Sequence, residues 1–267
     1  MTFLLRSPAT FDDDESIQKY VKSGNARLIK GDGLVLADIK NLWAAASSER
    51  PVDVVLFTVG FSEHLITFQI SISIPNFPFI LAGSSSFHPI KGFVISPHNL
   101  VTQCLLNVLC EMPKSNPLPK VITLSTLGVS RSSRSQVPFL LNIVYGYMIS
   151  HPLQDKLGAE RVIYHCAGWN WNPKDGEPKE DLMGEKWQER DGLPAPGQLK
   201  NAMIVRPAML NDGDCVADSG KAGSPYRAAE GNVKGWSISR KDVAHFIFDA
   251  VTNHWDEYGN KQVSIAY

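Results

Sequence analysis

The sequence predicts an α/β protein with a doubly wound, mainly parallel sheet and helices on both faces. Strand-like and helix-like segments alternate along the chain, which is the order expected of a parallel sheet covered by helices. The run at 52–60 is apolar apart from Asp53 and Thr58, as is typical of a strand buried on both faces. No internal repeat divides the 267 residues, so we expect a single domain over 1–267.

The predicted elements follow one another along the whole chain. Ser96 can cap one helix, with Pro97 in its first turn, where a missing N–H costs nothing. Ser239 and Asp242 have the spacing of a capping box at the start of the last helix. We expect strands at 2–5, 26–30, 52–60, 120–126, 201–207 and 261–267, helices at 37–48, 96–112, 138–150 and 155–168, and a short strand with a helix at 235–255.

The charge balance excludes several classes of partner. The chain carries 26 basic and 27 acidic residues, so it has no field to attract nucleic acid or an anionic membrane. Its four cysteines follow no metal-ligand spacing, which predicts buried, reduced thiols and no metal site, with disulfides as the less favoured alternative. The opening apolar run is too short for a signal peptide, and the longest apolar stretch is interrupted by polar residues and prolines. We therefore expect a cytoplasmic protein without a membrane span.

Residues that can bind a ligand follow the first two strands, where open α/β sheets bind ligands beyond the carboxyl ends of their strands. After the first strand, Arg6 offers a planar fork of donors and Ser7 a hydroxyl, which suits the 2′-phosphate of NADP. An acidic residue there would favour NAD instead. A surface arginine is the simpler interpretation of Arg6 taken alone. After the second strand, Asp32 can accept from an adenine amino group and Gly33 permits close backbone approach, although the same residues form an ordinary turn.

Further candidates follow the later strands. Gly60 ends a central strand and leaves room for a cofactor to cross the sheet. Ser125 can hydrogen-bond a substrate carbonyl, and a buried or capping serine is the alternative. Lys156 lies on a helix and can bind the hydroxyls of the nicotinamide ribose and lower the pKa of a neighbouring acid. Its alternative role is an i,i+4 pair with Glu160. Pro207 can wall the nicotinamide ring, or simply end its strand.

The order of these segments resembles that of a known family. The chain contains, in the order seen in atypical short-chain dehydrogenases, the stretches LLRSPATF, ARLIKGDG, PVDVVLFTVG, KVITLSTLGVS, DKLGAE, MIVRPAML and SISRKDVAHFIFDAV. More narrowly, it resembles fungal members of their NAD(P)H-binding, NmrA-like branch. The resemblance covers most of the chain and implies a Rossmann fold that binds NADP(H). It implies a site with Arg6 and Ser7 at the 2′-phosphate, Asp32 and Gly33 by the adenine, Thr58, Val59 and Gly60 along the ribose, and Ser125, Lys156 and Pro207 near the nicotinamide.

One departure from the family pattern concerns the start of the fold. The family begins with a strand, a glycine-rich G-x-x-G-x-x-G turn and a helix, and we interpret all three as missing here, through a shortened gene model or a processed form. That turn holds the pyrophosphate at a helix N-terminus. The missing strand would lie in mid-sheet, between the strands at Leu4 and Val55, whose backbone groups would lose their partners at about 1–3 kcal/mol each.

A second departure is the segment 61–82, which carries no charge after Glu63 and enters a loop that is short in relatives. We interpret it as a retained intron translated in frame. The alternatives are a real strand at 64–74 that occupies part of the vacant position, or a segment that binds a membrane or a partner. A further segment, 168–197, is rich in glycine, proline and charge and is either a substrate lid or a solvated surface loop.

The sequence leaves three functions open. The Y-x-x-x-K pair of conventional short-chain dehydrogenases is absent, because Pro152 stands four residues before Lys156, and Tyr145 and Tyr147 lie too far upstream. The first hypothesis is an NADP(H)-dependent oxidoreductase that acts on a small carbonyl compound, with Ser125 and Lys156 as catalytic residues that handle protons. The second is a non-catalytic regulator that senses the NADP redox state. The third is a truncated product that binds no cofactor.

Overall fold

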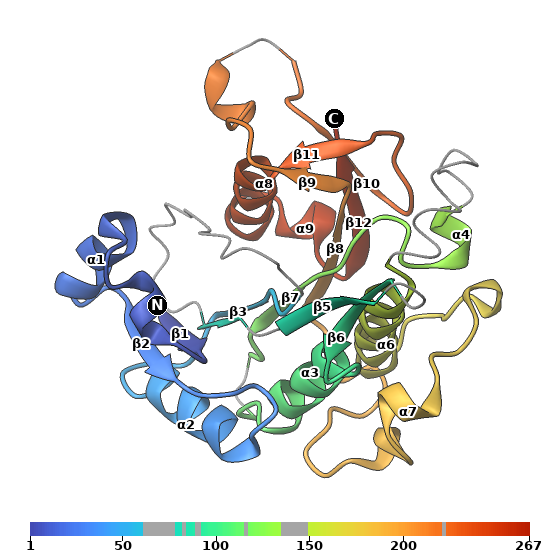
Figure 1. The fold of residues 1–267 in the computed structure, drawn as a ribbon, viewed down its shortest axis with the longest axis horizontal. Coiled ribbons are helices and arrows are strands. Elements are labelled where there is room, and N and C mark those ends of the chain that lie inside the picture. Colours follow the sequence, from blue (N-terminus) through green and yellow to red (C-terminus); the bar gives the residue numbers. More distant parts are fainter. Residues whose placement is uncertain (61–77, 82–83, 89–91, 115–116, 135–148, 221–222) are drawn as a thin grey trace.

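An eight-stranded sheet forms the centre of the molecule (Figure 1). The computed structural model describes residues 1–60, 78–81, 84–88, 92–114, 117–134, 149–220 and 223–267. In sheet order the strands are β10 (Arg227–Glu230), β12 (Lys261–Ala266), β8 (Ala202–Pro207), β7 (Lys120–Leu124), β3 (Val54–Phe57), β4 (Pro78–Leu81), β1 (Thr2–Leu5) and β2 (Arg27–Lys30). Every neighbouring pair is parallel except β10 and β12.

Helices cover both faces of this sheet. In Figure 1, α2 (Leu36–Ala46), α3 (Leu100–Cys110) and α6 (Ser150–Ala167) lie below the sheet, and α8 (Arg240–Thr252) and α9 (Trp255–Tyr258) lie above it. Alternate strand residues face the two layers: Val55 and Phe57 pack with α2, α3 and α6, whereas Val54 and Leu56 pack with α8 and with α1 (Glu15–Lys22). The predicted fold class, a doubly wound and mainly parallel α/β sheet, is confirmed.

Two small strand pairs stand beside the main sheet. One is the antiparallel pair β5 (Ser84–His88) and β6 (Gly92–Ser96), and the other is the parallel pair β9 (Met209–Asn211) and β11 (Ser237–Ser239). The short helix α4 (Arg131–Arg134) follows β7. Within the described residues, no helix has the length and apolar character needed to cross a membrane.

Strand β4 lies in the position between β1 and β3 that the sequence leaves without a strand. Its residues Pro78–Leu81 pair with Thr2–Leu5 on one side, and Phe79 and Ile80 pair with Leu56 and Phe57 on the other, all in parallel register. The position is therefore filled from inside the segment 61–82. The strand expected for this role, 64–74, lies outside the described residues, and the retained intron stays a prediction.

The helix predicted at 96–112 begins later than expected. Ser96 ends β6, the Ser96–Pro97 peptide bond is cis, and α3 starts at Leu100, so the prediction of a serine cap was wrong. At the last helix the serine cap is confirmed, because the Ser239 hydroxyl accepts from the Asp242 amide over 2.9 Å. The reciprocal bond of a capping box is not formed, because the Ser239 amide donates to the Tyr267 hydroxyl over 3.0 Å. Most of the helix predicted at 138–150 lies outside the described residues.

The segment 168–197 is folded against the helices beneath the sheet. It contains η2 (Pro173–Asp175), α7 (Glu180–Met183) and η3 (Trp187–Glu189). Leu182 and Met183 are buried, and Arg190 donates to the side chain of Asn107 on α3 over 2.7 Å. Most of its other residues are exposed, and the solvated surface loop stays a prediction. The substrate lid stays a prediction.

Candidate functional site

The carboxyl ends of the parallel strands meet at one edge of the sheet, and the sequence-predicted residues gather there in two groups. One group follows β1 and β2 and comprises Arg6, Ser7, Asp32 and Gly33. The other lies at the ends of β3, β7 and β8 and comprises Thr58, Val59, Gly60, Ser125, Pro207 and, from α6, Lys156. Strand β4 separates the two groups in the sheet.

Lys156 lies between the ends of β3 and β7. Its Nζ donates to the carbonyl oxygen of Leu124 over 3.1 Å, and a Cβ atom added at Gly60 would lie 3.8 Å from the same Nζ. Ser125 follows Leu124 directly and is held by its own amide, which donates to the Val205 carbonyl over 2.7 Å. We call Gly60, Leu124, Ser125 and Lys156 the Lys156 cluster. It joins three chain segments that are far apart in the sequence.

Two hydroxyls beside the Lys156 cluster have no hydrogen-bond partner. Ser125 is only 4% exposed and Thr123 only 1%, and neither Oγ of Ser125 nor Oγ1 of Thr123 is bonded within the described residues. An unsatisfied buried hydroxyl costs about 1–3 kcal/mol, so such groups indicate a position where a ligand or water completes the bonding. Thr123 lies in β7 and Ser125 follows the strand, on either side of Leu124, whose carbonyl accepts from the Lys156 ammonium.

Burial changes the acidity of Lys156. It lowers the pKa of the ammonium to about 8, while the carboxylates of Asp155 and Glu160 raise that pKa in part. A lysine with a pKa near 8 can donate a hydrogen bond as the ammonium at neutral pH and can release a proton a little above it. The cluster thus combines a proton-handling amine, a hydroxyl and a glycine at which an added Cβ would make only ordinary contacts.

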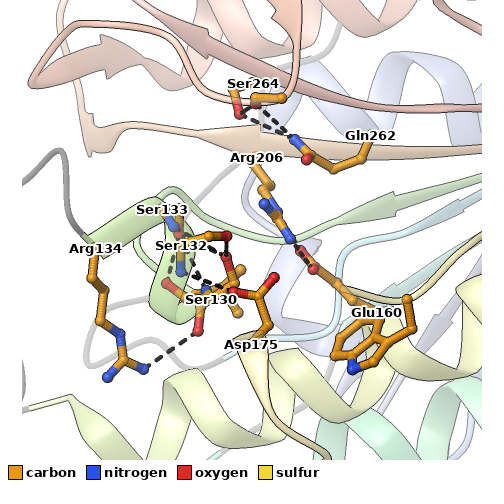
Figure 2. A network of polar contacts seen from close by, with 12 residues as sticks. Ser130, Ser132, Ser133, Arg134, Glu160, Asp175, Arg206, Gln262 and Ser264 are labelled. Carbon is orange, nitrogen blue, oxygen red and sulfur yellow. Dashed lines mark hydrogen bonds and ion pairs between the residues drawn. The ribbon is translucent and has the colours of Figure 1, made fainter. Parts of the chain in front are cut away.

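The sequence offered an ion pair between Lys156 and Glu160 as an alternative role for the lysine. Glu160 pairs with another residue instead. Its two carboxylate oxygens are held by Arg206 of β8, through Nε at 2.8 Å and through Nη2 (Figure 2). The Glu160 side chain is 0% exposed and that of Arg206 is 6% exposed. Burial lowers the pKa of Arg206, and the contact with Glu160 more than reverses this. This fully buried ion pair was missed by the sequence analysis, although a charged residue inside the apolar strand 202–207 indicates a buried partner.

Asp155, next to Lys156 on α6, is also held by another element. Its carboxylate accepts from the amides of Val101 and Thr102, over 2.7 and 2.9 Å, in the first turn of α3. A carboxylate at this place satisfies two of the free amides of a helix start and suits its positive end. Burial raises the pKa of Asp155, and these amide bonds lower it in part.

The loop after Ser125 is fixed by a network of serines (Figure 2). The Ser133 hydroxyl donates to the Ser130 carbonyl over 2.9 Å, and the Ser132 amide donates to the carboxylate of Asp175 over 2.8 Å. Arg134 donates to the Gly128 carbonyl over 2.9 Å. Through Asp175, one turn of the segment 168–197 is thus anchored to the loop that follows β7.

In the first group, Arg6 and Asp32 lie against each other. Arg6 Nε is 3.0 Å from Asp32 Oδ2, and Nη2 donates to Oδ1 over 3.4 Å. About a third of each side chain is exposed, so both are accessible to a ligand. Ser7 is exposed beside them, and the Gly33 carbonyl accepts from the side chain of Asn107 over 3.0 Å. Arg6, predicted to bind the 2′-phosphate, and Asp32, predicted to bind the adenine, thus form an ion pair with each other.

Two predicted residues offer only their backbone. Val59 is 0% exposed and packs in the core with α2 and α3, so its side chain does not line the edge. Pro207 is buried, and its carbonyl accepts from the Leu127 amide over 2.8 Å, which ties β8 to the loop after Ser125. The sequence pattern placed these residues at strand ends but did not give the direction of each side chain.

The cysteines and the acidic residues give no sign of other chemistry. Burial raises the pKa of Cys104 and of Cys166 to about 12, so both stay thiols at neutral pH. In the part of the chain that the structure describes, no group of three or more His, Cys, Asp or Glu side chains is arranged to hold a metal ion.

Comparisons with known proteins give a relative and structural neighbours. No family model matches the sequence. Reductase pytE of Aspergillus terreus is 33% identical over 153 residues, which are 56% of this chain and 48% of the relative, so the match spans about half of that protein. ChuY, an anaerobillin reductase of Escherichia coli O157:H7, aligns with a TM-score of 0.51 at 11% identity over 99% of this chain and 95% of its own. A wide-type short-chain dehydrogenase/reductase of Veillonella parvula, in complex with NADP, aligns with a TM-score of 0.48 at 11% identity over 100% of this chain and 82% of its own.

The strand order and the ChuY alignment agree on the architecture. At 11% identity the alignment bears on the fold alone. The sheet is parallel except at one edge, has helices on both faces and gathers polar residues at the carboxyl ends of its strands. The chain therefore has a Rossmann-like α/β fold.

Proposed function

We propose that the chain is an NADP(H)-dependent oxidoreductase that reduces a small carbonyl compound at the Lys156 cluster. The observation that carries this proposal is the cluster itself: a buried amine, a hydroxyl without a partner and a glycine, all at the carboxyl ends of parallel strands. The similarity to a fungal reductase over about half of that protein supports the same reaction class.

The residues present fit a dinucleotide. Within the described residues the hydroxyls of Ser125 and Thr123 lack partners, and a Cβ added at Gly60 would make only ordinary contacts. Arg6, about a third exposed at the end of β1, offers a cation for a 2′-phosphate, and Asp32 can exchange its contact with Arg6 for one with an adenine amino group. When bound, NADPH supplies the hydride.

The chain's own groups would orient the substrate and handle the proton. The Ser125 hydroxyl donates to the substrate carbonyl oxygen, and Lys156 donates from the position it holds on the Leu124 carbonyl. With a pKa of about 8, the Lys156 ammonium can give up a proton as negative charge develops on that oxygen. In this proposal Ser7 and Thr58 contribute hydroxyl contacts along the cofactor, and Gly33 and Val59 contribute backbone contacts.

The second candidate is a regulator that binds NADP(H) without turning it over. The observation that favours it is the lack of a tyrosine four residues before Lys156, where Pro152 stands in the first turn of α6. Both candidates predict cofactor binding, but only the first predicts oxidation of NADPH.

Turnover of NADPH with a panel of small aldehydes, ketones and enones tests the proposal. We expect Lys156→Met and Ser125→Ala each to lower the rate by about 100-fold or more, the usual contribution of a positioned proton donor. The matched control is Lys120→Met. Lys120 is a partly buried lysine at the opposite end of β7, where it donates to the Val251 carbonyl over 2.9 Å.

Lys120→Met should change stability and leave the rate within about twofold. NADPH binding without oxidation of any substrate would favour the regulator. A rate that is unchanged in Lys156→Met would remove the Lys156 cluster from the reaction, because the enzyme would then work without its central amine.

A further inference from the structure

Lys156 has a carboxylate on each side along α6, yet it is bound to neither. Asp155 is its neighbour in sequence, and Glu160 lies one turn further on, at the i,i+4 spacing that lets lysine and glutamate pair on a helix. Among the described residues, no ion pair within 4.0 Å joins Lys156 to either carboxylate. The ammonium lies on the Leu124 carbonyl instead.

Each carboxylate is held by a partner on another element. The amides of Val101 and Thr102 bind Asp155 at the start of α3. Arg206 of β8 binds Glu160 through two nitrogens, which occupies both of its oxygens. Figure 2 shows the Arg206 side chain extending from its strand directly to Glu160. Because both groups are almost fully buried, the pair is a fixed arrangement rather than a solvated contact.

We propose that Arg206 is a positioning residue for Lys156: by holding both oxygens of Glu160, it keeps that carboxylate off the ammonium, which stays on Leu124 and open to a substrate. This inference rests on the proposed function, in which Lys156 donates a proton to the substrate. It explains how a lysine between two acids stays unpaired and available for that step. Arg206 acts through Glu160 and itself touches neither cofactor nor substrate.

Among the described residues, the charged groups that act on Lys156 are few. From its own helix it faces Asp155 and Glu160, and both raise its pKa. From the end of β3 it faces Gly60, and from β7 the Leu124 carbonyl, which carry no charge. Arg206 stands behind Glu160 on β8. Loss of Arg206 would leave Glu160 as an unpaired buried carboxylate. Lys156, one turn away on the same helix, is then a cation with which Glu160 can pair.

The test is a pH titration of the Lys156 amine by NMR, in protein labelled with carbon-13 at Cε of lysine and without any cofactor. Lys156→Met assigns the resonance. We expect Arg206→Gln to raise the midpoint by about one pH unit or more, since an unshared carboxylate at ion-pair distance favours the ammonium. In the double variant Glu160→Gln with Arg206→Gln, the carboxylate is gone, and the midpoint should return to the wild-type value or below it.

Arg161→Gln is the matched control. Arg161 lies on α6, like Lys156, and pairs with Glu177 over 2.8 Å. Its replacement also removes one positive charge, but it frees no carboxylate beside Lys156. Its midpoint should equal that of the wild type. If Arg206→Gln does not fold, Arg206→Lys serves in its place: a single ammonium cannot hold both Glu160 oxygens in the bidentate way, so a smaller upward shift is expected.

A folded Arg206→Gln with the wild-type midpoint, or a double variant with the same upward shift, would overturn the proposal. NADPH turnover measured against pH in the same variants separates this result from the function. If no variant, including the wild type, turns over NADPH while the midpoint moves as expected, the proposed function fails and the positioning role of Arg206 stands.

Discussion

The Lys156 ammonium donates to the carbonyl oxygen of Leu124 over 3.1 Å, where β7 ends. This contact joins a helix to the edge of the sheet at which the other candidate residues gather. Burial lowers the pKa of the amine to about 8, from an ordinary value of 10.5. The same group therefore links the chemistry of the site to the stability of the fold.

The pKa of Lys156 predicts how stability depends on pH. Between about pH 8 and 10.5 the unfolded chain keeps a proton that the folded chain has lost, so the free energy of unfolding contributed by this residue rises with pH across that window. Below it, the buried charge lowers stability by up to about 3 kcal/mol. The free energies of unfolding of the wild type and Lys156→Met can be measured in urea at pH 7 and pH 9.5. The variant should be more stable than the wild type at pH 7, and this difference in stability should be smaller at pH 9.5. A difference that does not change with pH would contradict the lowered pKa.

Gly60→Ala should weaken cofactor binding without harming the fold. The added Cβ would meet only Lys156 Nζ and the Thr58 carbonyl, both at 3.8 Å, which is ordinary contact. Replacement of a glycine at such a position raises stability by about 0.4–1 kcal/mol. The methyl group would occupy the space beside Lys156, so we expect binding of NADPH, measured by calorimetry, to weaken about tenfold or more.

Gly158→Ala is the structural counterpart. A Cβ there would lie 2.4 Å from Thr102 Oγ1 and 3.2 Å from Met183 Sδ, so the variant should lose about 1–3 kcal/mol of stability through overpacking between α6 and α3. If Gly60→Ala bound NADPH as tightly as the wild type, the space above Gly60 would not be part of the cofactor site.

Tyr267 should stabilise the protein at neutral pH more than in acid. Burial raises the pKa of Asp242, but hydrogen bonds from the Tyr267 hydroxyl, two amides and Ser239 outweigh this and hold that pKa below its ordinary value. The lowered folded pKa gives stability that is present above the unfolded pKa, near 3.9, and is lost as pH falls towards the folded value. Tyr267→Phe should therefore cost about 1–3 kcal/mol at pH 7 and less at pH 3, by urea unfolding.

Tyr20→Phe is the control for this effect, because the Tyr20 hydroxyl makes no hydrogen bond within the described residues and its loss should be nearly neutral at both pH values. An equal loss of stability in Tyr267→Phe at pH 7 and pH 3 would show that the hydroxyl does not act through the charge of Asp242.

Ile80→Pro tests whether β4 belongs to the sheet. Ile80 pairs with Leu4 on one side and Phe57 on the other, so a proline there removes a backbone donor in mid-sheet, at about 1–3 kcal/mol for the acceptor left unsatisfied. Lys30→Pro is the control in the edge strand β2. The amides of Arg27 and Gly31 donate to β1, so the alternating amide of Lys30 faces away from it. Equal stability of the two variants in urea would contradict a central β4.

The main-sheet strands other than β4 and β10, and the helices α2, α3, α6 and α8, followed from local sequence pattern. Runs such as 54–57 and 202–205 are apolar on both faces because both faces are covered. The serine and aspartate spaced three apart at 239–242 form the expected cap. These features depend on residues close together in the chain, so the sequence alone contains the information.

Features that depend on distant residues were not predicted. The start of α3 is capped by Asp155, 54 residues further along, and not by Ser96. The partner of Glu160 is Arg206 rather than the near residue Lys156. The position between β1 and β3 is filled from a segment whose composition gave no strand at 78–81. In each case, the choice among partners is made by packing in three dimensions.

The assignment of an NADP(H) site at this edge of the sheet is tested most directly by thermal unfolding with increasing NADPH or NADH. A ligand that binds only the folded chain at 100 times its Kd adds about 2.7 kcal/mol of stability. We expect NADPH to raise the melting temperature more than NADH, and Arg6→Ala to remove that difference. Arg27→Ala, which breaks a surface ion pair with Glu49 at the opposite end of the neighbouring strand, should retain it. A cooperative transition that neither dinucleotide shifts would show that this edge does not bind the cofactor.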